Sequence, residues 1–361
     1  MKKKLKYILV FIPISVYIFF LKEDSIWTFI TSALAIIPLA MYMNFTIDKI
    51  ASNLGSTWGG LLSITFGNTT ELIISLFAIM DGLLNVVKAA ITGTIIMNLL
   101  LILGLSFFVG GLKRRTQSFD RVMAITNSTM LMLAVAGMLI PAIFYFGSSN
   151  IRTIVLGKLS LGVGFVLFFT YLASLYFTLF IHEKEKNKGN EEKEPANNND
   201  NSENENYQKN NSNLKYILCL IGITILISLQ AHILVDSISI ISEDLNISPS
   251  FIGIIVIPII ANVAENYTAI NMAWKNKINL SINIAIGSSI QVALMLVPLL
   301  IFLSHVIGQP MNVLFNILEI SSIVMSVLAI NVVYLQGKSN WFEGLQLVAV
   351  YLIIALAFYF A

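Results

Sequence analysis

The sequence predicts an all-α polytopic membrane protein with eleven transmembrane helices: a first helix plus two inverted five-helix repeats. Of its 361 residues, 57% are hydrophobic and 12% are charged, and the mean hydropathy is +0.81. Soluble domains carry roughly 25% charged residues. Apolar runs long enough to cross a bilayer as helices recur along the chain, and the alternating segments of a membrane barrel do not. One polar motif also occurs twice.

The composition excludes several other classes. A single cysteine, Cys219, rules out an internal disulfide and a cysteine-based metal cluster. The three histidines are scattered without ligand spacing, no HExxH motif occurs, and no catalytic Ser/His constellation stands out, so we expect no enzyme and no cofactor. The net charge of +2 gives no reason to expect a nucleic-acid partner.

The apolar runs define the predicted helices in chain order. The first follows the basic start "MKKKLK" and has no small-residue cleavage site after it, so we read it as a retained helix and not a signal peptide. The second continues as an amphipathic stretch through "NFTIDKIASNLG". The eleven predicted segments are 5–21, 26–43, 58–80, 84–110, 121–146, 154–181, 214–240, 250–273, 278–305, 311–334 and 341–360.

A polar segment divides the chain. Residues 182–213 lack apolar periodicity and hold eight acidic residues against five lysines, which is typical of a disordered linker. A regulatory cation-binding role for this acidic segment is the alternative. The predicted organisation is an extra helix in 1–22, a first half in 23–181, the linker in 182–213 and a second half in 214–361.

Lysine and arginine in the short loops predict the orientation. "MKKKLK", "GLKRRTQSFDR", "WKNK" and "QGKS" fall on one side of the membrane, and the opposite loops hold few basic residues, apart from Arg152. We therefore expect a multi-pass protein of the cell (cytoplasmic) membrane, with a cytoplasmic N-terminus and linker and an extracytoplasmic C-terminus.

The repeat appears when the chain is shifted by 194 residues. "GNTTE" at 67–71 then meets "ANVAE" at 261–265, which aligns Asn68 with Asn262 and Glu71 with Glu265; Gly93 meets Gly287 and Thr94 meets Ser288 farther on. Five predicted segments form each half. An odd number of crossings makes the halves opposite in orientation, which is typical of secondary transporters whose site lies at broken helices near the midplane.

The two motifs place carboxylates where they are costly. A charge at bilayer depth costs at least about 2.5 kcal/mol, and two facing carboxylates disfavour each other's ionisation. Either a divalent cation or two protons relieves that repulsion, which provides a basis for exchange. Carboxylate, amide, hydroxyl and carbonyl oxygens suit Ca²⁺. The candidate cation- and proton-binding residues are Glu71, Glu265, Asn68, Asn262, Ser288, Gln291, Thr94 and Asn98, with Glu71 and Glu265 as metal ligands.

Alternatives remain open for several side chains. Thr94 and Ser288 are small residues that also allow close helix packing. Glu319 is a third acid in an apolar run, either a modulator of transport or a residue near a helix end. His232 and Asp236 are four apart and read as a local pair in preference to ligands. Lys88 and Lys275 read as snorkelling residues.

These motifs resemble the calcium/proton antiporter (cation/H⁺ exchanger) family of the calcium/cation antiporter superfamily. The resemblance rests on "STWGGLLSITFGNTTELIISLFAI", "AITGTIIMNLLLILGLSFFVGG" and "ENYTAINMAWKNKINLSINIAIGSSIQVAL", and extends over nearly the whole chain outside the linker and first helix. It implies Ca²⁺ transport driven by protons, with Glu71 and Glu265 binding the cation and protons in turn. Asn68, Asn262, Ser288 and Gln291 also fall on family motif positions.

The second motif departs from the family pattern. Ala261 stands where the family has glycine and Asn266 where it has histidine, and Phe45 and His232 stand where an acid is common. Asparagine does not titrate, so Asn266 is a candidate modulator of ion choice and proton coupling. The same fold exchanging Ca²⁺ or another divalent cation for Na⁺, or a cation channel, are the alternatives, and homo-oligomerisation is left open.

Overall fold

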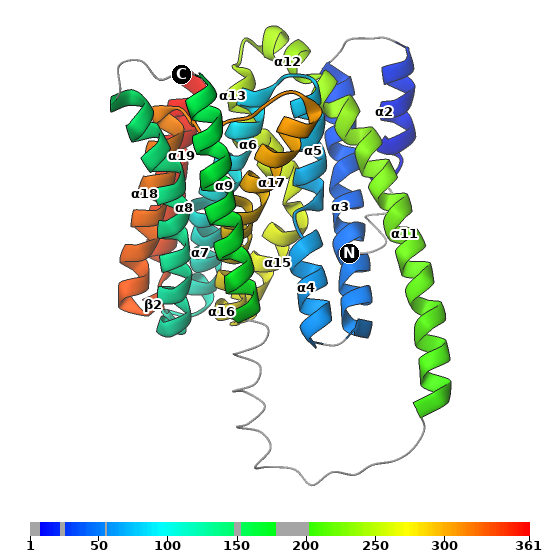
Figure 1. Cartoon of the computed structure of the whole chain (residues 1–361). Helices are drawn as coiled ribbons and strands as arrows, with labels where there is room; N and C mark the ends of the chain where they lie inside the picture. The colour runs from blue at the N-terminus through cyan, green and yellow to red at the C-terminus, as the bar shows by residue number, and fades with distance from the viewer. Residues whose placement is uncertain (1–7, 22–25, 55, 148–152, 178–201) are drawn as a thin grey trace.

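The protein is a bundle of long, nearly parallel helices (Figure 1). The computed structural model describes residues 8–21, 26–54, 56–147, 153–177 and 202–361. Within these ranges, eight helical spans are long and apolar enough to cross a membrane, or nine if one sharply bent pair counts as a single span. The chain is therefore an all-helical, multi-pass membrane protein, as its composition predicts.

The elements, in chain order, are α2 (Phe11–Phe20), α3 (Ile26–Leu54), α4 (Ser56–Phe66), α5 (Thr69–Met80), α6 (Leu84–Ile96), the π-helix η1 (Met97–Ile102), α7 (Leu103–Lys113), β1 (Gln117–Ser118), α8 (Arg121–Gly147), α9 (Thr153–Tyr176), α11 (Ser202–Asp236), α12 (Ile238–Leu245), α13 (Pro249–Phe251), the π-helix η3 (Ile252–Val256), α14 (Ile257–Ala261), α15 (Val263–Trp274), α16 (Ile278–Gln291), the π-helix η4 (Val292–Leu296), α17 (Val297–Ile307), α18 (Ile317–Gln336), β2 (Lys338–Ser339) and α19 (Trp341–Phe360). The strands β1 and β2 pair antiparallel.

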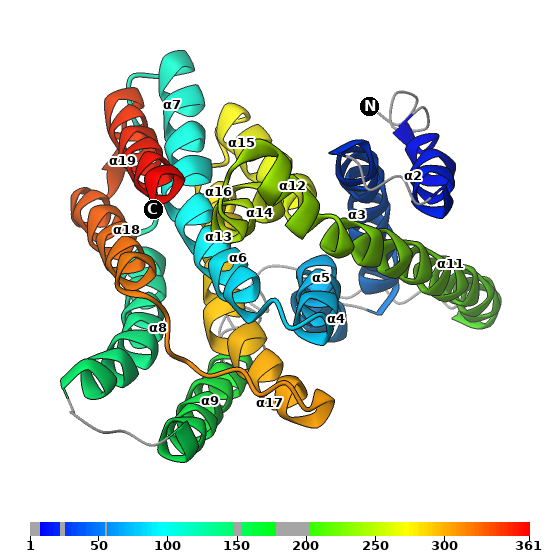
Figure 2. The ribbon, with the colours of Figure 1, turned by 90° about the horizontal axis from the view of Figure 1, so that it is seen from above.

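Three helices stand together on one side of the bundle (Figure 2). α11 packs along α3, and α2 packs against both. The hydroxyl of Ser15 in α2 donates a buried 2.7 Å hydrogen bond to Oε1 of Gln230 in α11. α3 is one continuous helix through Leu54, which confirms the predicted amphipathic extension of the second segment.

Both motifs break their helices at an asparagine. Asn68, between α4 and α5, has φ −96° and ψ 21°. Asn262, between α14 and α15, has φ −105° and ψ 12°, and the two helical segments there meet at a bend of 66°. The same residue type in the same conformation therefore interrupts a helix at each of the two predicted motifs.

The similarity extends beyond the break. α5 and α15 begin 194 residues apart and end 194 residues apart, and so do the starts of α6 and α16. The turn after α5 holds Gly82 at φ 75°, and the turn after α15 holds Asn276 at φ 65°. A π-helix then follows each partner helix, as η1 and η4. The repeat found in the sequence is therefore also a structural repeat, in which helix ends, turns and π-helices occur in the same order in both halves.

One pair of helices crosses at glycines. A β-carbon on Gly93 of α6 would collide with the backbone of Ile254 in η3, and one on Gly253 would lie 2.8 Å from the carbonyl oxygen of Val86. Small residues allow such close backbone approach in membrane bundles. Gly287, the repeat partner of Gly93, has no atom within 4 Å of its β-carbon position. The two equivalent glycines therefore lie in different packing environments.

The predicted segment 311–334 begins too early. Residues 308–316 form an irregular stretch, and α18 begins only at Ile317 because the side chain of Asn316 caps it. Lys88 holds this stretch by donating to Asn312 Oδ1 at 2.6 Å and to the carbonyl oxygen of Leu314 at 2.8 Å. The snorkelling role expected for Lys88 is therefore wrong, since its ammonium group satisfies acceptors of a partly buried loop.

The structure also differs from the prediction of a disordered linker in 182–213. α11 begins at Ser202, so the part of the segment from there to residue 213 is helical. Local helix formation in a polar sequence leaves no apolar periodicity, which is why the pattern missed it. The remainder of the linker, like the first residues of the predicted first helix, lies outside the described residues.

Candidate ion-binding site

The two motif glutamates occupy matching places at the helix breaks. Glu71 lies in the first turn of α5, after Asn68, and Glu265 lies in the first turn of α15, after Asn262. Glu71 and both asparagines are buried, whereas Glu265 is half-buried. A helix N-terminus favours a negative charge because of its unpaired amide groups, so each break supports its own carboxylate.

One side chain from each half holds the carboxylate of Glu71. Asn262 Nδ2 donates a 2.5 Å hydrogen bond to Glu71 Oε1. The Thr94 hydroxyl donates to the same oxygen, and Asn262 Nδ2 also lies 3.4 Å from Thr94 Oγ1. In the other direction, Asn68 Nδ2 donates to Gln291 Oε1 at 3.1 Å. The two motifs therefore meet at one centre, as the spacing of the repeat predicts.

Several buried oxygens at this centre have no hydrogen-bond partner among the described residues: Asn68 Oδ1, Glu71 Oε2, Glu265 Oε2 and Ser288 Oγ. An unpartnered buried polar atom costs about 1–3 kcal/mol, so four together call for a missing ligand. All four are hard oxygen donors, and hard oxygens in numbers above four are the preferred ligands of Ca²⁺. The residues present fit a bound calcium ion or bound protons.

Access to the two glutamates differs. A cavity of about 530 Å³ reaches Glu265, Ser288 and Gln291, and its wall includes Asp48 of α3 and Gly287 of α16. From Glu265 it continues past Ser63 of α4 and Asn44 and Asp48 of α3, in the half of α3 that leads to the α3–α4 turn. Water and ions at that end can therefore reach Glu265.

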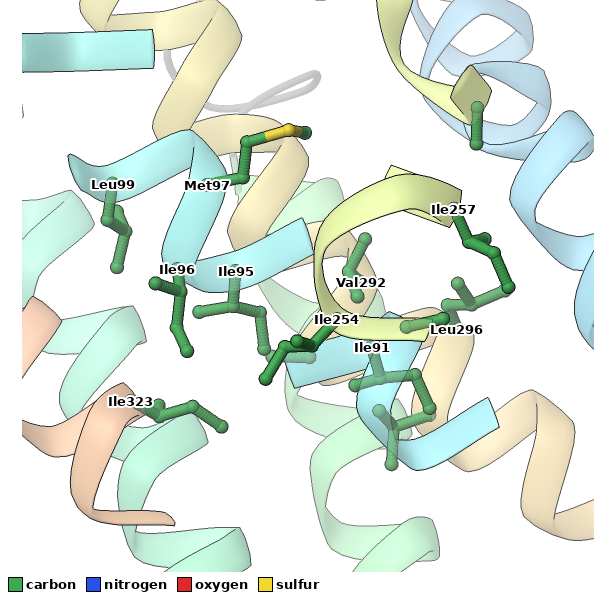
Figure 3. Close-up of a cluster of buried hydrophobic side chains, with 14 of the residues drawn as sticks. Ile91, Ile95, Ile96, Met97, Leu99, Ile254, Ile257, Val292, Leu296 and Ile323 are labelled. Carbon is green, nitrogen blue, oxygen red and sulfur yellow. The ribbon is translucent and has the colours of Figure 1, made fainter. Parts of the chain in front are cut away.

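Much less free space adjoins Glu71. The only space lined by Glu71 among the described cavities measures about 10 Å³, at the limit for one water molecule. Its walls include Ile91, Ile257, Val292 and Leu296. Figure 3 shows these four side chains converging from α6, α14 and the α16–α17 region. Hydrophobic packing therefore leaves almost no free space beside Glu71, whereas the large cavity reaches Glu265.

The remaining predicted residues lie apart from the glutamates or serve another purpose. Asn98 is buried in η1, and its Nδ2 has no partner in the described structure. Asn266 directs Nδ2 toward Met97 Sδ at 3.7 Å, so the residue in place of the family histidine packs on a thioether. Glu319 accepts from the Asn316 amide at 2.8 Å in a capping box, which supports the helix-end alternative for this acid.

The structure adds residues that the motif search missed. Asp48 and Asn44 of α3, Thr268 of α15 and Asn283 of α16 bring polar groups into the cavity. The signal for Asp48 and Asn44 was present in the sequence, because both lie in the polar face of "NFTIDKIASNLG". Thr268 and Asn283 carried no such signal, since their position in the cavity depends on how α15 and α16 pack.

Comparison with known proteins shows the family and the fold of the chain. The chain matches the family model described as "Sodium/calcium exchanger protein" over residues 24–180 and 215–360. It is 39% identical over 355 residues to the Ca²⁺/H⁺ antiporter of Aphanothece halophytica, covering 98% of this chain and 95% of that protein. It is 36% identical over 349 residues to the Ca²⁺/H⁺ antiporter ChaA of Bacillus subtilis (strain 168), covering 96% of each. The solved structure of native YfkE matches with a TM-score of 0.82 at 32% identity, over 99% of this chain and 100% of that one.

Proposed function

Because the chain belongs to the Ca²⁺/H⁺ antiporter family within the sodium/calcium exchanger superfamily, we propose that it exchanges Ca²⁺ for H⁺ by alternating access. The observation that carries the proposal is the pair Glu71 and Glu265, which begin two equivalent helices and each keep one unpartnered carboxylate oxygen. The names of the relatives state the same exchange for those proteins.

The site would bind either Ca²⁺ or protons in turn. With Ca²⁺ bound, the carboxylates are ionised and the cation offsets both their burial and their mutual repulsion. With protons bound, the carboxyl groups are neutral and the cation has lost its strongest ligands. Asn68, Asn262, Ser288, Thr94 and Gln291 supply neutral oxygens or hold the carboxylates in place. Binding of one load therefore expels the other, which couples the two fluxes.

The architecture we propose is a first helix followed by two inverted halves of five crossings each. The shared boundaries of α5 with α15 and of α6 with α16 support it, and so does the division of the family match around residues 181–214. The eight long spans and the bent pair, counted as a ninth span, become eleven crossings when α2 and the α4–α5 segment are included. We assign the halves to 23–181 and 214–361, with the linker 182–213 between them.

The basic loops set the orientation in this proposal. Lysines or arginines occur at the end of α7, in the turn between α15 and α16, and in β2, and these elements lie at the same end of the bundle as the α3–α4 turn (Figure 1). Basic residues favour the cytoplasmic side. We therefore place the protein in a cell membrane with its cavity open to the cytoplasm, a cytoplasmic N-terminus and linker, and an extracytoplasmic C-terminus.

Transport in vesicles tests the proposal. Purified protein in proteoliposomes with an acidic interior should accumulate Ca²⁺ and release protons, and Glu71→Gln or Glu265→Gln should each abolish accumulation. Glu343→Gln is a matched control, because Glu343 is a buried acid that caps α19 away from the motifs. Undiminished uptake in either motif variant would overturn the assignment of the glutamates.

One residue near the second motif makes Na⁺ a second candidate for the counter-ion. Asn266 occupies the place of the family histidine and cannot carry a proton. If protons are not the counter-ion, a Na⁺ gradient without a pH difference will drive Ca²⁺ uptake in the same vesicles. If the rate of Ca²⁺ uptake depends on the pH difference and not on the Na⁺ gradient, H⁺ is the coupling ion. Flux that saturates at carrier-like turnover excludes the cation channel.

A further inference from the structure

A second group of ligand-type side chains lies at the far end of α5 from Glu71. Asp81 follows α5, and His232 and Asp236 lie one helical turn apart near the end of α11. One ligand atom from each of the three lies within 4.8 Å of the other two. His232 Nε2 is 3.8 Å from Asp236 Oδ2. The sequence predicts the His232–Asp236 pair but not the approach of Asp81, which lies about 150 residues earlier.

Aromatic packing fixes the orientation of the imidazole. The His232 ring stacks on Phe77 of α5, with ring centroids 5.4 Å apart and an interplanar angle of 23°. Phe19 of α2 meets the same ring edge-on at 6.0 Å. The ring nitrogen Nδ1 is buried without a hydrogen-bond partner among the described residues, so Nε2 is the nitrogen presented to the two carboxylates. A ligand held in place before binding loses less conformational entropy when it binds.

The charges of the group are unbalanced. Partial burial raises the pKa of Asp81, the Asp236 carboxylate raises it further, and His232 lowers it. The repulsion between two carboxylates that share one neutral or singly charged imidazole is relieved by a divalent cation. Lys and Arg side chains are absent from the described ion pairs and cation–ring contacts of these three residues.

We propose that Asp81, His232 and Asp236 form a second metal site, specific for a divalent transition-metal ion such as Zn²⁺, that joins the α5–α6 turn to α11. One imidazole nitrogen with two carboxylate oxygens is a ligand set for Zn²⁺ and its neighbours, with water in the fourth position. Tetrahedral Zn²⁺ ligands lie roughly 3.4 Å apart, so small side-chain rotations close the observed spacing. Ca²⁺ prefers six to eight oxygens and fits this set poorly.

Zn²⁺ binding to the full chain, measured without transport, tests the proposal. The double variant Glu71→Gln/Glu265→Gln serves as background, so that the motif site does not contribute. Isothermal titration with Zn²⁺ should show one site in the background. Asp81→Asn, His232→Phe and Asp236→Asn should each weaken it about tenfold or more. His232→Phe keeps the aromatic packing on Phe77 while removing the ligand.

Asp244→Asn is the matched control, because Asp244 is an exposed acid on the neighbouring α12 outside the group. It should leave the affinity unchanged. Co²⁺ substituted for Zn²⁺ should give tetrahedral visible absorption bands in the background and lose them in His232→Phe. The proposal is overturned if the background has no Zn²⁺ site, if all three ligand variants keep the affinity of the background, or if Asp244→Asn loses as much affinity as they do. Melting without metal identifies any misfolded variant, and the remaining ligand variants still decide the outcome.

Discussion

The side-chain amide of Asn262 donates a 2.5 Å hydrogen bond to Oε1 of Glu71, across 191 residues of sequence. The asparagine of one motif thus positions the carboxylate of the other. Since the same oxygen also accepts from Thr94, Oε1 is fully engaged and Oε2 is the oxygen left for a ligand.

Removing the Asn262 amide should weaken cation binding. A hydrogen bond to a charged group contributes about 1.5–3 kcal/mol, so Asn262→Ala should raise the apparent KM for Ca²⁺ by roughly tenfold or more. Ca²⁺ uptake into proteoliposomes measures it. Asn85→Ala, at an exposed position in α6, is the control. An unchanged KM in Asn262→Ala would show that Thr94 alone holds the carboxylate.

A thiol in the large cavity near Glu265 should react with reagents in solution, and a thiol in the small space beside Glu71 should not. In a Cys219→Ala background, Ser288→Cys places a thiol on the wall of the large cavity, and Ser75→Cys places one in the sealed space beside Glu71. A charged thiol reagent added from the cytoplasmic side should modify the first and spare the second. Equal modification rates would contradict a one-sided cavity.

The repeat-related glycines should respond differently to the same change. Gly93→Ala forces a methyl group into the backbone of Ile254, and overpacking of this kind costs about 1–3 kcal/mol, so its melting temperature should fall. Gly287→Ala meets no atom within 4 Å and should melt no lower than the parent. By the repeat register, however, Gly287 should approach α4 when the opposite side opens, so exchange should slow. Full exchange in Gly287→Ala with a lower melting temperature would reverse this assignment.

Asp48 should assist the arrival of cations. Its carboxylate lines the cavity that leads to Glu265, and a charge in contact with solvent contributes about 1 kcal/mol or less. Asp48→Asn should therefore raise the KM for Ca²⁺ roughly two- to fivefold, leave the maximal rate unchanged, and lose its effect at high salt. Asp244→Asn, at the other end of the molecule, should change neither value. A loss of maximal rate in Asp48→Asn would place this residue in the central site instead.

The sequence predicts the broken helices and the paired glutamates because polar residues in an apolar run are conspicuous. The breaks fall within the two motifs, at Asn68 and Asn262, and the 194-residue register holds to the residue at the ends of α5 and α15. The sequence could not separate Glu319 from the motif acids, because a capping box depends on the backbone at Asn316. The hydropathy of residues 311–316 also predicted a helix there. Hydropathy contains no information on tertiary contacts, and in the structure Lys88 donates hydrogen bonds to acceptors of a loop in this stretch.

The sequence also could not predict the difference in packing between Gly93 and Gly287. The two positions are identical in residue type and in register, and only the packing of α6 on η3 and the opening beside α16 distinguish them. A symmetric sequence here folds into an asymmetric structure, and the side of the membrane from which the site is reached follows from that asymmetry.

Ca²⁺ binding by the four unpartnered oxygens around Glu71 and Glu265, as proposed above, would also link the lifetime of the protein to its cargo. A ligand that binds only the folded state stabilises it by about 2.7 kcal/mol at a hundred times its dissociation constant. A cell rich in calcium would therefore hold more of these molecules in folded form, and calcium starvation would expose them to proteolysis. Under this linkage the abundance of the protein follows the concentration of the ion that it removes, without any change in its synthesis.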